Sequence, residues 1–139
     1  TPEKFKKVSG NPMPLDKAMD ITNNWREAVK GLFGDDDNKI PRAFYIPIGD
    51  MEALVDNYKK YKLSGVRAYF VLSNPQPPYT DEMRGILVPV TEEIGDDGKP
   101  YYKDLIIKAA DPAAKHDDMS IYDLTRPCPV FCDKASPLY

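Results

Sequence analysis

Both cysteines of the chain lie close together, and their type and spacing could support redox or metal chemistry. They end the segment Cys128-Pro129-Val130-Phe131-Cys132. On a bent segment that contains proline the two sulfur atoms could meet. A disulfide closing so short a loop would stabilise the fold by roughly 2 kcal/mol on the chain-entropy estimate. The pair could also be two reduced, packed thiols, part of a metal site, or a redox centre.

The residues around the cysteine pair match redox and metal sites only in part. Redox cysteines usually have C-x-x-C spacing at a helix N-terminus, where the dipole lowers the pKa of the thiol. Here the spacing is one residue longer, and no helix is predicted to follow. A structural zinc ion needs four ligands, and the chain offers two cysteines and one histidine. Carboxylates or a second copy could complete such a site, with Asp123, Arg67 or His116 tuning it.

No other arrangement of residues predicts catalysis. His116 lies in a polar run without an identifiable nucleophile beside it, which is typical of a surface histidine. The sequence has no G-x-S-x-G elbow, phosphate loop or nucleotide fingerprint. The aspartates at 35–37 lack the alternating ligands and the glycine of a calcium loop, so they predict a solvated connection. We therefore expect no catalytic residue, no metal and no cofactor.

Arg67 and Tyr69 lie in the middle of a predicted strand. Along Gly65–Leu72 small and apolar side chains alternate with Arg67, Tyr69 and Val71, a pattern typical of a strand buried on at least one face. Arg67 is predicted either to be solvated beside Tyr69 or to pair with a carboxylate such as Asp123, because an unpaired buried charge is costly. Arg67, Tyr69 and Asp123 are thus candidate binding or tail-anchoring residues.

Two predicted helices position these strands. Apolar residues recur at helical spacing across Leu15–Phe33, and Gly34 is a suitable stop. A second helix is predicted to begin at Gly49 and to lead into Gly65–Leu72. Because a strand is also predicted at Ala43–Ile48, before this helix, the pattern indicates a βαβ unit with two parallel neighbouring strands.

Two further strands, Gly85–Thr91 and Tyr101–Lys108, flank the turn sequence Asp-Asp-Gly-Lys at 96–99 and predict an antiparallel hairpin. Residues 1–14 contain three prolines and predict an extended arm. Residues 109–139 have little periodicity and predict a tail folded back over the domain. The fold prediction is a single α+β domain over residues 1–139, with two helices packed on a four-stranded mixed sheet.

Composition restricts the classes of partner. The net charge is −3 and acids and bases are interspersed, which argues against nucleic acid. No apolar run approaches the ~18 residues of a membrane span, and the composition is typical of a soluble domain. The nine tyrosines and five phenylalanines could build a recognition surface. We therefore expect a non-enzymatic binding or interaction module for a protein or small molecule. Self-association stays open, as does a peptide ligand presented by Pro75–Pro78.

Three motifs resemble those of a family of small bacterial proteins of unknown activity: A-F-x-I-P, G-[IV]-R-x-Y, and a late P-C-P-x-x-C preceded by aspartate. The matching positions are Ala43, Phe44, Ile46, Pro47, Gly65, Val66, Arg67, Tyr69, Asp123, Pro127, Cys128, Pro129 and Cys132. The resemblance covers most of the chain from Leu15 onward, and the C-terminal motif is the most specific part. It implies a shared fold and no particular activity. The proline loop at Asn74–Tyr79 is longer than the linker of the family.

Overall fold

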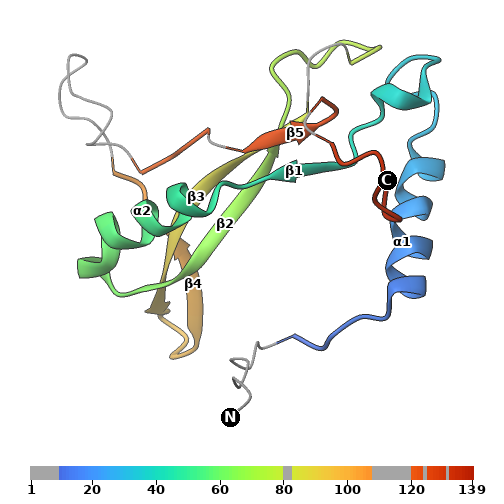
Figure 1. Ribbon diagram of the computed structural model, residues 1–139. Helices are drawn as coiled ribbons and strands as arrows, with labels where there is room; N and C mark the ends of the chain where they lie inside the picture. Colours follow the sequence, from blue (N-terminus) through green and yellow to red (C-terminus); the bar gives the residue numbers. More distant parts are fainter. Residues whose placement is uncertain (1–9, 80–82, 108–119, 124, 131) are drawn as a thin grey trace.

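The computed structural model describes residues 10–79, 83–107, 120–123, 125–130 and 132–139 (Figure 1). These residues contain two α-helices, two short 3₁₀-helices and five strands. In chain order the elements are α1 (Leu15–Ala28), η1 (Asp37–Lys39), β1 (Ala43–Tyr45), α2 (Ile48–Tyr58), η2 (Lys59–Tyr61), β2 (Leu63–Val71), β3 (Arg84–Ile94), β4 (Pro100–Asp104) and β5 (Arg126–Cys128). An α+β fold is therefore confirmed. His116 lies outside the described residues.

The strands form two antiparallel sheets, so the prediction of one four-stranded mixed sheet is wrong. One sheet has the order β2-β3-β4, and the other pairs β1 with β5. The expected parallel pairing of β1 with β2 is also wrong, because β1 pairs with β5 with Ala43 opposite Cys128. The Arg42 N–H extends this ladder by donating to the Cys128 carbonyl at 2.8 Å. The helix that follows β1 covers the other sheet and does not return the chain alongside β1.

The main core lies between α2 and one face of the three-stranded sheet. Leu54 and Tyr58 of α2 pack with Leu87 of β3, and all three side chains are 5% exposed or less. Tyr122 closes one end of this core, since its hydroxyl is within hydrogen-bond distance of that of Tyr58 and its backbone bridges to Leu87. The C-terminal residues therefore contribute to the core as well as to the second sheet.

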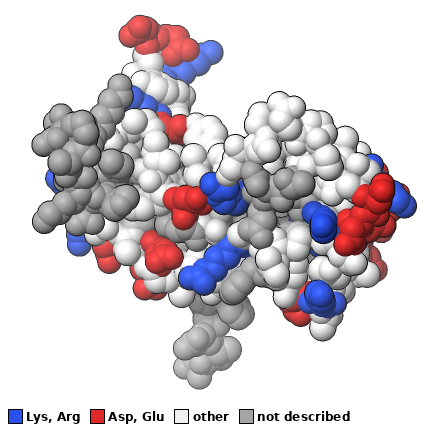
Figure 2. Space-filling view, turned by 90° about the horizontal axis from the view of Figure 1, so that it is seen from above, with Lys and Arg blue, Asp and Glu red and all other residues white. Residues whose placement is uncertain are grey.

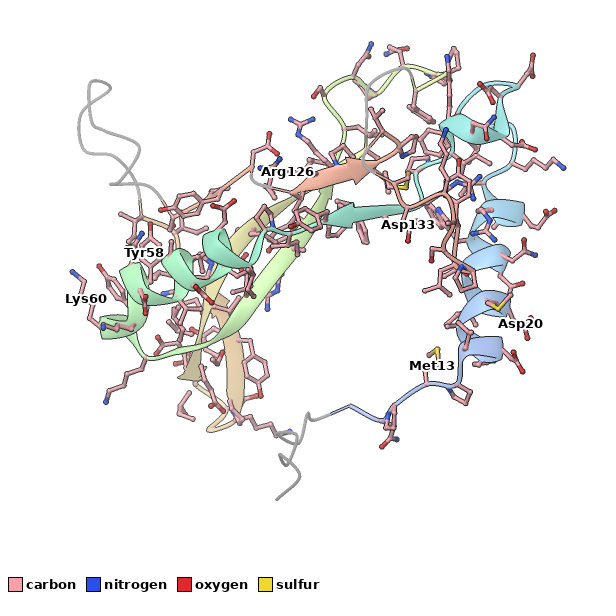
Figure 3. All side chains as sticks on the ribbon, viewed as in Figure 1. Met13, Asp20, Tyr58, Lys60, Arg126 and Asp133 are labelled. Carbon is pink, nitrogen blue, oxygen red and sulfur yellow. A yellow bond between two sulfur atoms is a disulfide. The ribbon has the colours of Figure 1, made fainter. Side chains whose placement is uncertain are left out.

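Helix α1 is attached to the rest of the fold by few contacts. None of its residues is buried, although the sequence predicted an apolar stripe that packs on a sheet. The Trp25 indole N–H donates to the Pro41 carbonyl at 2.6 Å, and Arg26 donates to the Leu138 carbonyl at 3.0 Å. In Figure 1, α1 and the C-terminus lie at one end of the molecule, α2 and the three-stranded sheet lie at the other, and β1 and β5 run between them. Met13 and Asp20 mark the first end in Figure 3, and Tyr58 and Lys60 mark the second.

The predicted hairpin is confirmed as β3 and β4, which pair from Val90–Asp104 to Ile94–Pro100. In its turn the Gly95 N–H donates to the Lys99 carbonyl, and the Gly98 N–H donates to the Gly95 carbonyl, both at 2.9 Å. Gly98 has φ of +77°, a left-handed conformation that only glycine adopts without a penalty.

Replacing Gly98 with alanine is expected to lower the free energy of unfolding by about 1 kcal/mol, because a left-handed L-residue costs roughly that much. A Cβ at this position meets no atom within 4 Å, so the loss comes from the backbone alone. Urea denaturation followed by circular dichroism measures it. Gly98→Asn is the matched control and should recover part of the loss, since asparagine tolerates this conformation. Equal stability of Gly98→Ala and the wild type would contradict the left-handed conformation of residue 98 in this turn.

Candidate functional site

An apolar groove of about 430 Å³ opens between β1 and the end of β2. Its aromatic side chains come from three separate elements: Trp25 from α1, Phe44 from β1 and Phe70 from β2. The Phe44 and Phe70 rings meet edge to face, with centroids 6.4 Å apart. The groove is lined by Trp25, Pro41, Arg42, Ala43, Phe44, Phe70 and Met83. We refer to this feature as the aromatic groove.

The positions of Phe70 and Phe44 follow from the alternation of side chains along β2 and from a glycine in β3. Phe70 shares a face with Val66, which belongs to the core under α2, but Phe70 itself is 75% exposed. Phe70 lies opposite Gly85 of β3. A Cβ at Gly85 would lie 3.3 Å from the Phe44 ring, so the missing side chain leaves room for that ring beside Phe70.

A second pocket, of about 390 Å³, lies next to the aromatic groove and shares Pro41 and Met83 with it. Cys128, Pro129 and Val130 form one of its walls. The remaining lining residues are Phe33, Gly34, Asp35, Asp36, Asn38, Lys39, Pro78 and Tyr79. The Tyr79 ring packs against Phe33 at 5.5 Å between centroids. The proline loop therefore ends in this pocket and is not presented over its whole length as a free peptide.

The structure joins Cys128 to Cys132 by a disulfide, with the two Cα atoms 4.8 Å apart (Figure 3). Cys128 is buried at the end of β5, whereas the neighbouring Val130 is 81% exposed. Among the residues that follow the pair, 133–139, the chain forms turns and no helix. No group of three or more His, Cys, Asp or Glu residues in the described part of the chain could hold a metal ion.

Arg67 pairs with Asp104 of β4, and not with Asp123. Its guanidinium also donates to the Tyr102 carbonyl at 3.1 Å, and the Tyr69 hydroxyl donates to the other carboxylate oxygen of Asp104. The hydrogen bond with Tyr69, and then the charge of Asp104, raise the pKa of Arg67 above its ordinary value. Arginine is charged at every physiological pH, so the guanidinium of Arg67 keeps its ion pair with Asp104 and links β2 to β4 across the sheet.

Asp123 has a different partner from the one that the sequence suggested. Both oxygens of its carboxylate share the single N–H of Arg84 Nε in a bifurcated hydrogen bond, at 3.0 and 2.9 Å. Arg84 also donates to the Ser73 hydroxyl at 2.9 Å, which ties the start of β3 to the loop after β2. Asp123 therefore anchors the C-terminal segment, through Arg84 and not through Arg67.

The predicted site residues do not converge on one centre. Register places Arg67 and Tyr69 on the opposite face of β2 from Phe70, away from the aromatic groove. Cys128 of the disulfide lines the neighbouring pocket. Residue patterns did not predict the roles of Trp25, Phe44 and Phe70 in the groove. The available signal was Phe70, a large aromatic on the apolar face of the predicted strand Gly65–Leu72. The roles of Asp104 and Arg84 were not predicted either.

Figure 2 shows acidic and basic side chains side by side on one face of the molecule, with uncharged surface between them. Neither α1 nor α2 has the length and the apolar character that crossing a bilayer requires. No family model, curated protein or solved structure matches the chain. A functional assignment must therefore come from the geometry of the site.

Proposed function

We propose that this chain is a non-enzymatic binding module whose aromatic groove takes an apolar group of a protein or small-molecule partner. The observation that carries the proposal is the convergence of Trp25, Phe44 and Phe70 around a concave, mostly apolar space. Ligand sites are typically concave and apolar with a few fixed polar groups. Moving apolar surface from water into such a site is favourable by about 25 cal/mol per Å².

The exposure of the groove aromatics supports a role beyond packing. Phe70 is 75% exposed and Trp25 is 41% exposed, so neither ring contributes its full area to the core. The charged residue of the groove, Arg42, is held in place: its guanidinium lies 4.1 Å from the centroid of the Tyr139 ring and donates to the Asp37 carbonyl at 3.3 Å. The guanidinium of Arg42 is therefore engaged within the chain, and the residue contributes a fixed part of the groove wall.

The first test uses the dye 8-anilinonaphthalene-1-sulfonate, which is apolar with one anionic group. Trp25 is the chain's one tryptophan, so energy transfer from tryptophan to the dye reports binding beside the groove. Phe70→Ser is expected to weaken dye binding by about tenfold, because burying a phenylalanine is worth roughly 1.5–3 kcal/mol. Since Phe70 is exposed, the variant should fold.

The control for this test is Ile94→Ser, which removes another exposed apolar side chain, at the far end of β3. We expect the dye affinity of this variant to equal that of the wild type. Equal losses in Phe70→Ser and Ile94→Ser would mean that the dye binds exposed apolar surface in general, and the proposed function would then fail.

Thiol–disulfide exchange at Cys128–Cys132 is a second candidate, favoured by the position of Cys128 in the wall of a pocket. In this reaction a thiolate of a dithiol partner attacks Cys132, which is less buried than Cys128, and releases Cys128 as a thiolate. The second thiol of the partner then displaces Cys132. The partner is oxidised to a disulfide, and this chain is left with two thiols.

A further inference from the structure

Among the described residues, no strand pairs with the outer edge of β2. The direction of the backbone groups along this edge follows from the register. β2 is the first strand of the order β2-β3-β4. On β3 the N–H and the C=O of Leu87 both bond to Tyr122, at 2.8 and 3.0 Å, and so point away from β2. Ala68 lies opposite Leu87. In an antiparallel pair such a residue also directs its own N–H and C=O away from the partner strand.

The same alternation applies to Val66 and Phe70, two residues to either side of Ala68. Pro89, opposite Val66, agrees with this pattern, because it has no N–H and its carbonyl accepts from Leu105 and not from β2. Val66, Ala68 and Phe70 thus direct their N–H and C=O groups to the free edge. No backbone hydrogen bond within the described residues uses them.

Between Val66 and Phe70 this edge lacks two features that usually protect an edge strand from pairing, a proline and a charged side chain directed at the edge. The β-bulge of β2 lies before this segment, between Leu63 and Gly65. β2 contains no proline, whereas β4 at the opposite edge of the sheet begins with Pro100. Gly65 and Ala68 are exposed, and a Cβ at Gly65 would meet no atom within 4 Å. The charged side chain of β2, Arg67, extends over β3 to pair with Asp104, so it does not block strand pairing at the edge.

The edge and the aromatic groove meet at Phe70. The side chains of Val66, Ala68 and Phe70 share one face, and Phe70 lines the groove. In an added strand, a residue opposite Ala68 or Phe70 would lie about 5 Å from β2 on the same face. An apolar side chain at that position points toward the ring of Phe70 and the space beside it.

We infer that the partner is an extended polypeptide segment that pairs with the free edge of β2 and inserts one apolar side chain into the aromatic groove. A row of alternating N–H and C=O groups is complementary to an extended backbone, and an adjacent apolar pocket selects the side chain. This inference rests on the proposed function and names the class of its partner.

The probe is the blocked peptide acetyl-Lys-Thr-Val-Phe-Val-Thr-Lys-amide, which has no tryptophan, so that Trp25 fluorescence reports binding. Two further versions carry N-methyl groups on alternate residues, one set for each edge of the peptide. Only one edge can pair with β2. We therefore expect one version to lose at least about tenfold in affinity, as the loss of two to three hydrogen bonds predicts. The other version should bind like the parent.

The matched protein variants are Ala68→Pro and Ala68→Ser. Proline removes an N–H that points to the free edge and leaves the bonds to β3 intact, which is where edge strands tolerate it. Ala68→Pro should lose peptide binding and keep dye binding, whereas Ala68→Ser should keep both. If Ala68→Pro does not fold, as judged by circular dichroism, the two methylated peptides still decide the question.

Several results would overturn the inference. Equal affinity of both methylated peptides would exclude backbone pairing. If dye binding depends on Phe70 but the parent peptide does not bind, the inference of a polypeptide partner is rejected and the proposed function stands. If neither the dye nor the peptide binds at the groove, the inference and the proposed function are both rejected. A wild-type dimer in sedimentation that Ala68→Pro dissociates would assign the edge to a second copy and not to a partner segment.

Discussion

Replacing Leu87 with alanine is expected to lower the free energy of unfolding by about 2–5 kcal/mol, the usual cost of emptying a core position. Leu87 is 2% exposed and packs with Leu54 and Tyr58 of α2. Its backbone bonds to Tyr122 do not depend on its side chain, so the loss comes from packing. Urea denaturation followed by far-ultraviolet circular dichroism measures it.

Ile94→Ala provides the control, since Ile94 lies on the same strand but is 69% exposed. Its effect should stay within about 0.5 kcal/mol, as is usual for a surface position. A loss below about 1 kcal/mol for Leu87→Ala would contradict the assignment of this cluster as the main core.

Replacing both Cys128 and Cys132 with serine is expected to lower the free energy of unfolding by about 2 kcal/mol, because the disulfide restricts a short loop in the unfolded chain. The disulfide also fixes the residue opposite Ala43, so the loss should include part of the β1–β5 pairing. Urea denaturation with and without dithiothreitol measures it. The wild type in reductant should match the serine variant, whose own stability should not change with reductant.

A separate measurement, the reduction potential of the disulfide after equilibration in a thiol redox buffer, distinguishes the two candidate functions. A reduction potential below about −300 mV is typical of a structural disulfide and would exclude thiol exchange. A value between about −270 and −120 mV lies in the range of exchange proteins and would support it. Equal stability of the oxidised wild type and the serine variant would contradict a stabilising role.

Local patterns in the sequence were sufficient for part of the fold. The β3–β4 hairpin follows from turn residues that only a few backbone conformations accept. Helix α2 begins within a residue of its predicted start, and its apolar stripe places Leu54 and Tyr58 in the core. In these elements the determining residues are neighbours in sequence, so periodicity and turn chemistry are enough.

Pairing between distant segments was not accessible in the same way. β1 and β5 are three residues long and about eighty residues apart, so neither carries a periodicity that identifies its partner. Arg67 finds Asp104 because the register of β3 aligns both side chains on one face, and a one-residue shift would separate them. Asp123 was an equally good partner by charge alone.

The aromatic groove was not predicted, because its large apolar residues have the same sequence pattern as residues of a buried core. An apolar stripe on α1, which includes Trp25, has the same spacing whether a sheet covers it or it borders a groove. The state of the cysteine pair was easier to predict, since a spacing of four residues on a bent segment allows the two sulfur atoms to meet. The choice among a disulfide, two thiols, a metal site and a redox centre still required the neighbouring residues of β1 and the pocket.

Helix α1 has a thermodynamic consequence for binding. An isolated helix shorter than about 12–15 residues is marginal in water, and α1 has 14 residues, none of them buried. Its local unfolding free energy should therefore be well below that of the sheet. Because Trp25 lies on this helix and lines the groove, a ligand that contacts the indole in this position favours the folded form of α1. Part of the binding free energy is then used to fold the helix. The affinity of the groove for a ligand therefore depends on the stability of α1, through the side chain of Trp25.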